Sequence, residues 1–364
     1  MTAHEAFLAL SHKSNLARPY VERPMDPEKL LFWSPVHNAE ADLSTTLKRR
    51  FARTLELSQT SLPQPSQSGF YVFTAAAVGP GPWLSGSDEG IVPGGNIEYG
   101  LSNAAHGEES AVFGILNRYG LVPIQVVGFY YNPEPVNEKT FADPCGGCRD
   151  RLMPYCNPNM YFVQAGPPGK HADMVSVTQF RDYLFDTPRL VNPSSLNPTG
   201  HAQAIHGLKV GVSGYLPETL KPYQYGAAIV AEDGTVWQGS HWVNAGYDAF
   251  PSFSAALQTW RNASPQANVS KIVIAGAGSN IPLPLYADRQ DALEFAEALS
   301  FYRHGNINSP LPVELIQVNR AGEIISAALS NTSELLPHPF SAGEFGMTSA
   351  MQEYMAVLSL TRFR

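Results

Sequence analysis

Three residues with metal-binding side chains stand in a spacing typical of a catalytic zinc centre. His106 opens a stretch with helical periodicity, and Cys145 and Cys148 lie three residues apart directly after Pro144. One imidazole and two thiolates give zinc three protein ligands and leave its fourth coordination position to water. The sequence therefore predicts one Zn²⁺ per chain, held by His106, Cys145 and Cys148.

Glu108 stands two residues after His106, and its carboxylate suits a proton carrier. Residues two apart on a helix point in different directions, so Glu108 can face the open coordination position without being a ligand. The combination of H-x-E with P-C-x-x-C is typical of zinc deaminases. We expect zinc-bound hydroxide to attack an amine-bearing ring carbon, and Glu108 to carry protons to the ring nitrogen and the departing amine.

The elements around these residues place both ligand groups at helix starts. Proline is favoured in the first turn of a helix, and it precedes Cys145. Apolar side chains recur at helical intervals after His106, at Ala111, Val112, Ile115 and Leu116. The partial positive charge at a helix N-terminus stabilises thiolates and a bound hydroxide, so this placement favours reactive zinc.

Other interpretations attach to the parts of this pattern. A C-x-x-C pair alone also fits a structural zinc site or a redox pair, and H-x-E alone occurs by chance. The order His then Cys, together with the proline, favours the catalytic interpretation. We interpret Cys156 as a small buried residue. His241 and His304 have no Cys or carboxylate at ligand spacing, which predicts ordinary core or surface histidines.

Composition excludes several classes of protein. The 364 residues are 44% hydrophobic and 15% charged, as in a soluble protein of about two domains. A net charge of -8 argues against a nucleic-acid partner, and we interpret the basic run at 48–50 as a solvated helix face. All Cys lie between 145 and 156, which favours a metal site in a reducing, cytoplasmic environment. Neither a secretion signal nor an 18-residue apolar run is present, so we expect no membrane association.

The pattern along the chain predicts four segments of the α/β class. They are a small helical N-terminal segment at 1–65, a catalytic domain at 66–165, a connector at 166–200 and a second domain at 201–364. The second domain repeats the order of strands and helices but not the chemistry. Ser252, Phe253 and Ser254 stand where H-x-E is expected, and no Cys follows Cys156. We interpret it as a non-catalytic duplicate.

Two polar residues ahead of His106 are candidates for binding a sugar. Asn96 and Glu98 alternate along a strand-like stretch, which predicts that they share one face. An amide and a carboxylate together suit a sugar hydroxyl. Ordinary surface polarity is the alternative.

The chain resembles the cytidine deaminase family, in its long form with a catalytic domain and a degenerate second copy. The residues that carry the resemblance lie at 68–72, 96–98, 106–112 and 144–149, with weaker counterparts at 239–240, 244–245 and 251–257. The resemblance implies a duplicated three-layer α/β/α sandwich and a homodimer. It implies that His106, Cys145 and Cys148 bind zinc, that Glu108 carries protons and that Asn96 and Glu98 bind ribose. Phe70 would pack near the pyrimidine ring, and the reaction would release ammonia from cytidine or deoxycytidine.

Several departures from the family pattern bear on the substrate. Gly107 replaces the usual Ala between His and Glu and keeps the backbone carbonyl for the substrate, and Phe73 replaces a usual Gly. Asp143, just ahead of Pro-Cys, offers a carboxylate to a substrate amine. We expect a Gly/Pro-rich insertion with Trp83 to reshape the mouth of the pocket.

These departures leave alternatives open. The substrate is then a nucleoside, a modified nucleoside or an amine from a natural product. A deaminase acting on polynucleotides would need a basic channel lined with aromatic residues, which an acidic chain does not suggest. A non-catalytic scaffold stabilised by zinc is the third alternative.

Overall fold

The structure is a computed structural model. It describes residues 25–64, 71–84, 86, 88–99, 103–132, 141, 143–166, 173–184, 188–213, 225–243, 249–263, 267–278 and 280–338. Within these residues, no helix combines the length and the apolar character needed to cross a membrane.

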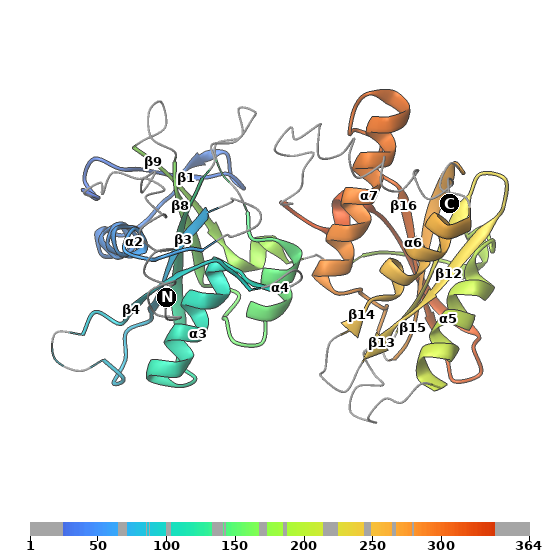
Figure 1. Cartoon of the computed structure of the whole chain (residues 1–364), viewed down its shortest axis with the longest axis horizontal. Helices are drawn as coiled ribbons and strands as arrows, with labels where there is room; N and C mark the ends of the chain where they lie inside the picture. Colours follow the sequence, from blue (N-terminus) through green and yellow to red (C-terminus); the bar gives the residue numbers. More distant parts are fainter. Residues whose placement is uncertain are drawn as a thin grey trace, which may run out of the picture. The chain divides into compact units, whose positions relative to one another are not determined.

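The described residues form two compact units of mixed α/β structure, which confirms the predicted fold class (Figure 1). The first unit holds the chain up to residue 142 and residues 151–181. The second holds residues 143–150 and the chain from residue 182 onward. The division falls inside one continuous helix, α4 (Gly146–Leu152).

A seven-stranded mixed sheet forms the middle of the first unit. Its strand order is β2-β1-β9-β8-β7-β3-β4, with β7 and β8 parallel. A separate hairpin, β5 and β6, precedes the first site helix. The strands are β1 (Leu31–Ser34), β2 (Ala39–Glu40), β3 (Tyr71–Val78), β4 (Ile91–Gly95), β5 (Ile97–Tyr99), β6 (Asn103–Ala105), β7 (Ile124–Asn132), β8 (Tyr161–Ala165) and β9 (Met174–Gln179).

Side-chain alternation along β3 assigns one helix to each face of this sheet. Phe73 and Ala75 are buried in a cluster with Phe51 of α2 (Thr45–Ser58). The neighbouring Thr74 points the other way, because its hydroxyl donates to a carbonyl in α3 (Gly107–Tyr119). The first unit is therefore a three-layer sandwich, with α2 and α3 on opposite faces of the sheet (Figure 1).

The second unit repeats this layering on a six-stranded sheet of order β10-β17-β16-β15-β11-β12. One strand pair of this sheet, β15 and β16, is parallel, whereas the first sheet has two parallel pairs, β7 with β8 and β1 with β9. Its strands are β10 (Arg189–Val191), β11 (Tyr225–Ala231), β12 (Val236–Ser240), β15 (Val269–Ala277), β16 (Pro312–Val318) and β17 (Ile324–Asn331), with a short hairpin of β13 (Trp242–Val243) and β14 (Ala249–Phe250). Its helices are α5 (His201–Ser213), α6 (Ser252–Ala263), α7 (Tyr286–His304) and α8 (Thr332–Leu335), and two 3₁₀ turns occupy Phe180–Tyr183 and Pro193–Ser195.

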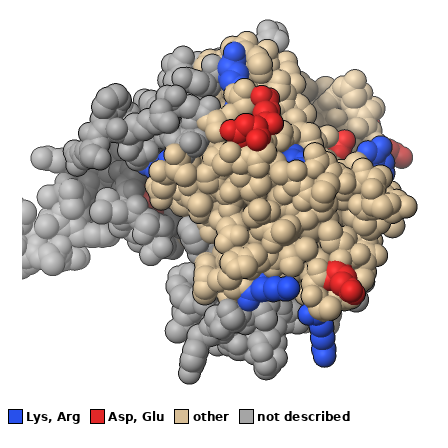
Figure 2. All heavy atoms as spheres, turned by 90° about the vertical axis from the view of Figure 1, so that its right-hand side faces the viewer, with Lys and Arg blue, Asp and Glu red and all other residues tan. Residues whose placement is uncertain are grey.

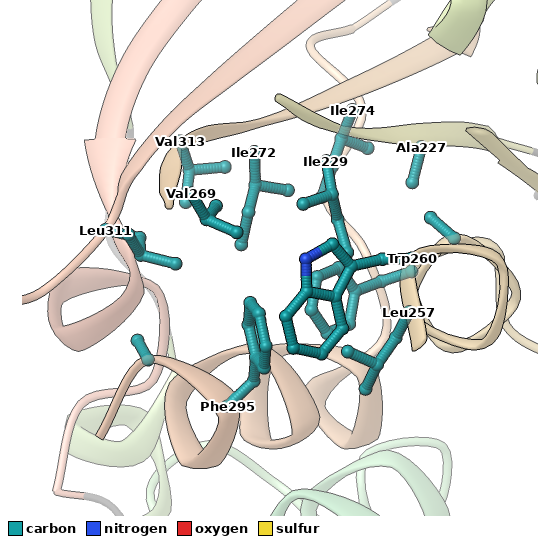
Figure 3. Close-up of a cluster of buried hydrophobic side chains, with 14 of the residues drawn as sticks. Ala227, Ile229, Leu257, Trp260, Val269, Ile272, Ile274, Phe295, Leu311 and Val313 are labelled. Carbon is teal, nitrogen blue, oxygen red and sulfur yellow. The ribbon is translucent and has the colours of Figure 1, made fainter. Parts of the chain in front are cut away.

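The larger core of the second unit lies between its sheet and helices α6 and α7. Trp260 of α6 is fully buried and meets Phe295 of α7 edge to face, with ring centroids 5.1 Å apart. Figure 3 shows both rings among the aliphatic side chains of the sheet, such as Ile272. The opposite sheet face packs on α5 through Ala204 and Val230. Burial of large aromatic rings on this scale is a major source of folding free energy.

The predicted N-terminal segment and the predicted connector both contribute strands to the two sheets. Residues 31–58, within the predicted N-terminal segment, supply β1, β2 and α2 to the first unit. The predicted connector contains β9 and β10. The connector is rich in Pro and Ser near its end, and strands of two to six residues give little periodicity to read.

A buried ionic cluster ties α5 to the second sheet. The Glu314 carboxylate lies 2.7 Å from Nε2 of His201 and 2.8 Å from Nζ of Lys271. Lys271 also donates to the backbone carbonyl of Asn197. Burial raises the pKa of Glu314, but the hydrogen bonds from His201 and Lys271 outweigh burial and hold the pKa below its usual value.

We predict that Glu314→Gln lowers the free energy of unfolding of the second unit by about 3 kcal/mol at pH 7, since it leaves Lys271 without its buried counter-charge. A carboxylate with a lowered pKa stabilises the fold above its unfolded-state pKa of about 4.3 and loses this effect as pH falls through the folded-state pKa. The difference from wild type should therefore shrink below about pH 4. Denaturant titrations at both pH values measure it.

The matched control is Glu323→Gln, which changes an exposed carboxylate in the turn between β16 and β17. An equal loss of stability in both variants, or a loss that does not depend on pH, would contradict the role assigned to Glu314.

Candidate metal centre

The structure brings the three predicted ligands together. The ligand atoms of His106, Cys145 and Cys148 all lie within 4.8 Å of one another, and they are the group of His, Cys, Asp and Glu side chains that could hold a metal ion among the described residues. Cys148 is buried, while His106 and Cys145 are partly exposed.

His106 stands at the start of α3, as predicted. It is the N-cap residue, with extended backbone, and its carbonyl accepts the first helical hydrogen bond, from the amide of Ser110. The amide of His106 donates to the carboxylate of Glu109, which reaches back from the first helical turn. This half of a capping box fixes the backbone of His106 relative to the helix.

Cys145 and Cys148 stand at the start of α4. Cys145 directly precedes the helix, and its carbonyl accepts the amide of Arg149. The amide of Cys148 lies 3.4 Å from the Cys145 sulfur and donates to it. A donor aimed at sulfur favours the thiolate form, so the turn is prepared for metal binding.

A single carboxylate links the start of α3 to the later part of α4. Glu109 is almost fully buried, and its oxygens lie 2.6 and 2.9 Å from Nη1 of Arg151 on α4. The same carboxylate accepts the amide of His106 at 3.2 Å. Because Arg151 lies three residues after Cys148, this ion pair connects the segment carrying the imidazole to the helix that begins at the thiolates.

Zinc fits this donor set. Zinc–sulfur bonds of about 2.3 Å and zinc–nitrogen bonds of about 2.0 Å place tetrahedral ligand atoms about 3.6 Å apart. The ligand atoms here lie within 4.8 Å of one another, so small side-chain movements bring them to bonding distance. Two thiolates and an imidazole suit zinc better than magnesium or calcium, which prefer oxygen ligands.

Glu108, the predicted proton carrier, occupies the same helical turn as the ligand His106. Its side chain is 7% exposed, although it is charged in its usual state, and it does not belong to the group of ligand atoms. Charged residues are rarely buried to this degree without a role or a partner. Its position two residues beyond His106 matches the arrangement expected from the sequence.

Steric crowding explains why position 107 is a glycine. A Cβ atom there would meet Cγ2 of Thr74 at 2.8 Å and Cγ1 of Val72 at 3.0 Å. The carbonyl of Gly107 accepts a hydrogen bond from the Thr74 hydroxyl at 2.7 Å. This bond attaches the first turn of α3 to β3. Close packing against β3 therefore accounts for the departure from Ala at this position.

The predicted sugar-binding pair has a different backbone setting from the one expected. Asn96 lies between β4 and β5 and is not part of either strand, so the alternation used to place it beside Glu98 is interrupted there. The Asn96 side-chain oxygen accepts the amide of Val72 at 2.8 Å. This bond fixes the amide group beside β3, and the role of both residues in sugar binding stays a prediction.

The remaining predicted residues have mixed outcomes. The carboxylate of Asp143 accepts the hydroxyl of Tyr183 at 2.8 Å, and its contact with substrate stays a prediction. Phe70 lies outside the described residues. Cys156 is buried, as expected, and burial raises the pKa of its thiol to about 12. His241 is a core histidine and His304 a surface one, as the sequence indicated.

The expectation that the insertion with Trp83 reshapes a pocket mouth is wrong for the described part of this segment. The insertion joins β3 to β4, and Asp88 within it accepts hydrogen bonds from Arg118 and Tyr119 at the C-terminal end of α3. His106 stands at the other end of this helix, about 20 Å away at 1.5 Å per residue. The Trp83 indole donates to the Gly79 carbonyl.

Three residues that position the site escaped the sequence analysis: Thr74, Glu109 and Arg151. Glu109 carried a readable signal, since Glu at the third helical position after an N-cap is typical of a capping box. Arg151 pairs with Glu109 across 42 positions of sequence, and Thr74 bonds to Gly107 across 33. Pairings over such distances leave no local pattern.

Comparisons with known proteins give a partial similarity. No protein-family profile matches the chain, and no curated protein does. Among solved structures, the chain is similar to cytidine deaminase from Burkholderia pseudomallei at 26% identity, over 38% of this chain and 98% of that one, with a TM-score of 0.28. Cytidine deaminase from Mycobacterium tuberculosis shares 18% identity over 40% of this chain and 98% of that one, with a TM-score of 0.26.

We predict that chelation of zinc makes Cys145 reactive while Cys156 stays inert in the folded protein. Cys145 is partly exposed, whereas the Cys156 thiol is buried with a pKa of about 12 and has almost no thiolate at neutral pH. Alkylation at pH 7.5 before and after chelation, with mass spectrometry of the labelled peptides, measures both thiols. Equal labelling of Cys156 and Cys145 without unfolding would contradict this assignment.

We predict that Gly107→Ala destabilises the protein by about 1 to 3 kcal/mol, the usual cost of overpacking, because the new Cβ meets Thr74. The double variant with Thr74→Ser should recover at least half of this loss, since serine keeps the hydroxyl bond and removes the crowding methyl. Thermal melts compare the variants with Gly147→Ala, whose Cβ meets only the Cys145 sulfur, at 3.9 Å. Failure of the serine to recover stability would show that the contact with Thr74 is not the cause.

Proposed function

We propose that this protein is a zinc-dependent hydrolase that deaminates a nucleoside or a related small heterocycle. The observation that carries the proposal is the convergence of His106, Cys145 and Cys148 beside a buried Glu108. Three protein ligands are the number that leaves zinc an open coordination position. A structural zinc site, by contrast, is closed by a fourth protein ligand, and Cys156 is not in the ligand group.

The chain's own residues perform the remaining steps of this reaction. Zinc, when bound, supplies a Lewis acid that lowers the pKa of water in its open position to about 7. Glu108 takes the proton of the attacking water and delivers protons to the ring nitrogen and the departing amine, so that ammonia leaves. The Glu109 carboxylate and Arg151 hold the ligand helices while this happens. The Thr74 hydroxyl fixes the Gly107 carbonyl at the turn between ligand and base.

The substrate contacts belong to this proposal as well. Glu98 and the amide nitrogen of Asn96 are assigned to a sugar hydroxyl, and Phe70 to a face of the heterocycle. Asp143 is assigned to a substrate amine, in competition with the hydroxyl of Tyr183 that it accepts in this structure. An extra carboxylate at this position favours a substrate with an additional amino group, so a modified nucleoside or a natural-product amine stands beside cytidine and deoxycytidine.

The second unit is assigned as a non-catalytic copy of the first. The order of its strands β17-β16-β15-β11-β12 and the parallel pair β15 and β16 correspond to β9-β8-β7-β3-β4 and the pair β7 and β8 of the first unit, and α6 begins at Ser252 without a ligand. A homodimer is the proposed assembly. A polynucleotide is disfavoured as substrate, since the net charge is -8 and the face drawn in Figure 2 shows scattered charged side chains of both signs among its described residues.

We predict that the zinc-loaded protein releases ammonia from at least one member of a panel of cytidine, deoxycytidine, cytosine, adenosine, guanine and aminated nucleoside antibiotics. Glu108→Gln should abolish turnover, by at least about 10²-fold, because the amide cannot carry protons. It should retain one zinc per chain, since Glu108 is not a ligand. Ammonia release and metal analysis are the two measurements.

The matched control is Glu98→Gln, which alters a carboxylate assigned to binding and should raise KM more than it lowers kcat. Zinc bound at one per chain, with no ammonia from any member of the panel, would favour the non-catalytic scaffold. Binding of single-stranded oligonucleotide at low salt would favour a polynucleotide deaminase instead.

A further inference from the structure

The turn between the two cysteine ligands is held by a residue of α7. The amide of Gly146 donates to Oε1 of Gln290, 2.5 Å away. The first amides of a helix have no partner within the helix, so a side chain from elsewhere must satisfy them or water does. Gly146 lies between Cys145 and Cys148, and its bond to Gln290 therefore fixes the peptide that joins the first thiolate to the helix.

The glycine at 146 is what allows this contact. A Cβ atom on Gly146 would meet the carbonyl oxygen of Tyr286 at 2.2 Å and the amide nitrogen of Ala287 at 2.9 Å. Both atoms are backbone and cannot move aside. The first turn of α7 thus packs directly on the cysteine turn, at a distance that only glycine permits.

The contact is reciprocal. The Asp150 carboxylate, from the second turn of α4, accepts the amides of Tyr286 and Ala287 at 2.8 Å each. Each helix therefore caps the N-terminus of the other with an acceptor, Asp150 in one direction and Gln290 in the other. Two helix starts that are each capped by the other helix restrain each other's position.

The two helices share a sequence pattern that explains the reciprocity. In both, an arginine five residues after a proline donates from Nε to that proline's carbonyl: Arg149 to Pro144 at 2.9 Å, and Arg289 to Pro284 at 2.7 Å. The acceptor follows the arginine directly, as Asp150 in α4 and Gln290 in α7. The second copy of the pattern has lost the ligands but has kept the arginine and the acceptor.

Gln290 is itself oriented by its helix. Its Nε2 donates to Oε1 of Glu294, one turn later, at 2.9 Å. This bond leaves the carboxamide oxygen directed at Gly146, so the acceptor is preorganised and does not have to be ordered by the metal.

We propose that Gln290 is a positioning residue of the metal centre, and that α7, which carries no ligand, holds the turn that presents Cys145 and Cys148 to zinc. The inference rests on the metal-binding part of the proposed function and does not require deamination. Residues that orient ligands commonly account for about 10- to 100-fold in metal affinity.

The test is zinc affinity, measured by competition with a chromogenic chelator, in Gln290→Met, Gln290→Glu and wild type. Gln290→Met keeps the length of the side chain and removes the acceptor, and it should weaken zinc binding about 10-fold. Gln290→Glu keeps an acceptor oxygen but gives up the Nε2 donor to Glu294, so its zinc affinity should fall between those of Gln290→Met and wild type. Gln258→Ala, at an exposed glutamine of α6, is the matched control and should have no effect.

Cobalt substitution provides a second readout that general destabilisation does not move. The thiolate-to-cobalt absorption should keep its intensity at saturation in Gln290→Met, since the three ligands remain, while the cobalt concentration needed rises. If Gln290→Met does not fold, Glu294→Ala frees the carboxamide from its orienting bond and should weaken zinc binding in the same direction. Affinity within 2-fold of wild type in the folded variant would overturn the proposal.

The failures of the two proposals are distinguishable. Wild-type protein that binds one zinc per chain but releases no ammonia overturns the proposed function, and the comparison of the Gln290 variants still decides the positioning role. Wild-type protein that takes up no zinc overturns both.

Discussion

The distance between two helix starts is the constraint on which the candidate site depends. An imidazole and two thiolates from segments about 40 residues apart serve one ion only while α3 and α4 are held in register. The buried Glu109 carboxylate provides this link, since it accepts the His106 amide and pairs with Arg151. The Glu109 carboxylate is buried and the Arg151 side chain is about half exposed, so the arginine compensates the buried charge from the solvent side.

The chemistry-bearing residues could be predicted from the sequence because their signals are local. His106, Cys145 and Cys148 were placed at helix starts from a proline and from apolar periodicity, and the structure confirms both helix starts. The α/β class followed from alternating strand and helix patterns, and it is also confirmed. Strands β9 and β10 were missed, because three to six residues amid prolines and serines give no measurable period.

Contacts between segments far apart in the sequence explain two glycines whose roles could not be predicted from the sequence. The sequence offers no reason for glycine at position 107, whereas the neighbouring Thr74 and Val72 side chains leave no room for a methyl group there. Gly146 appeared as part of a metal-binding motif, and its second role, close packing on Tyr286, is visible only in three dimensions. In both cases, glycine is required because a residue more than 30 positions away in the sequence packs against its Cα.

The division of the chain inside α4 has a consequence for how such a protein can change over generations. Residues 143–150, which include both cysteines, cluster with the later part of the chain and not with the segment that precedes them. A gene shortened near codon 200 would still encode every metal ligand. It would have lost the acceptor at Gln290 and the backbone that packs on Gly146. The cysteine turn would then need a new acceptor and a new packing surface, because both come from α7.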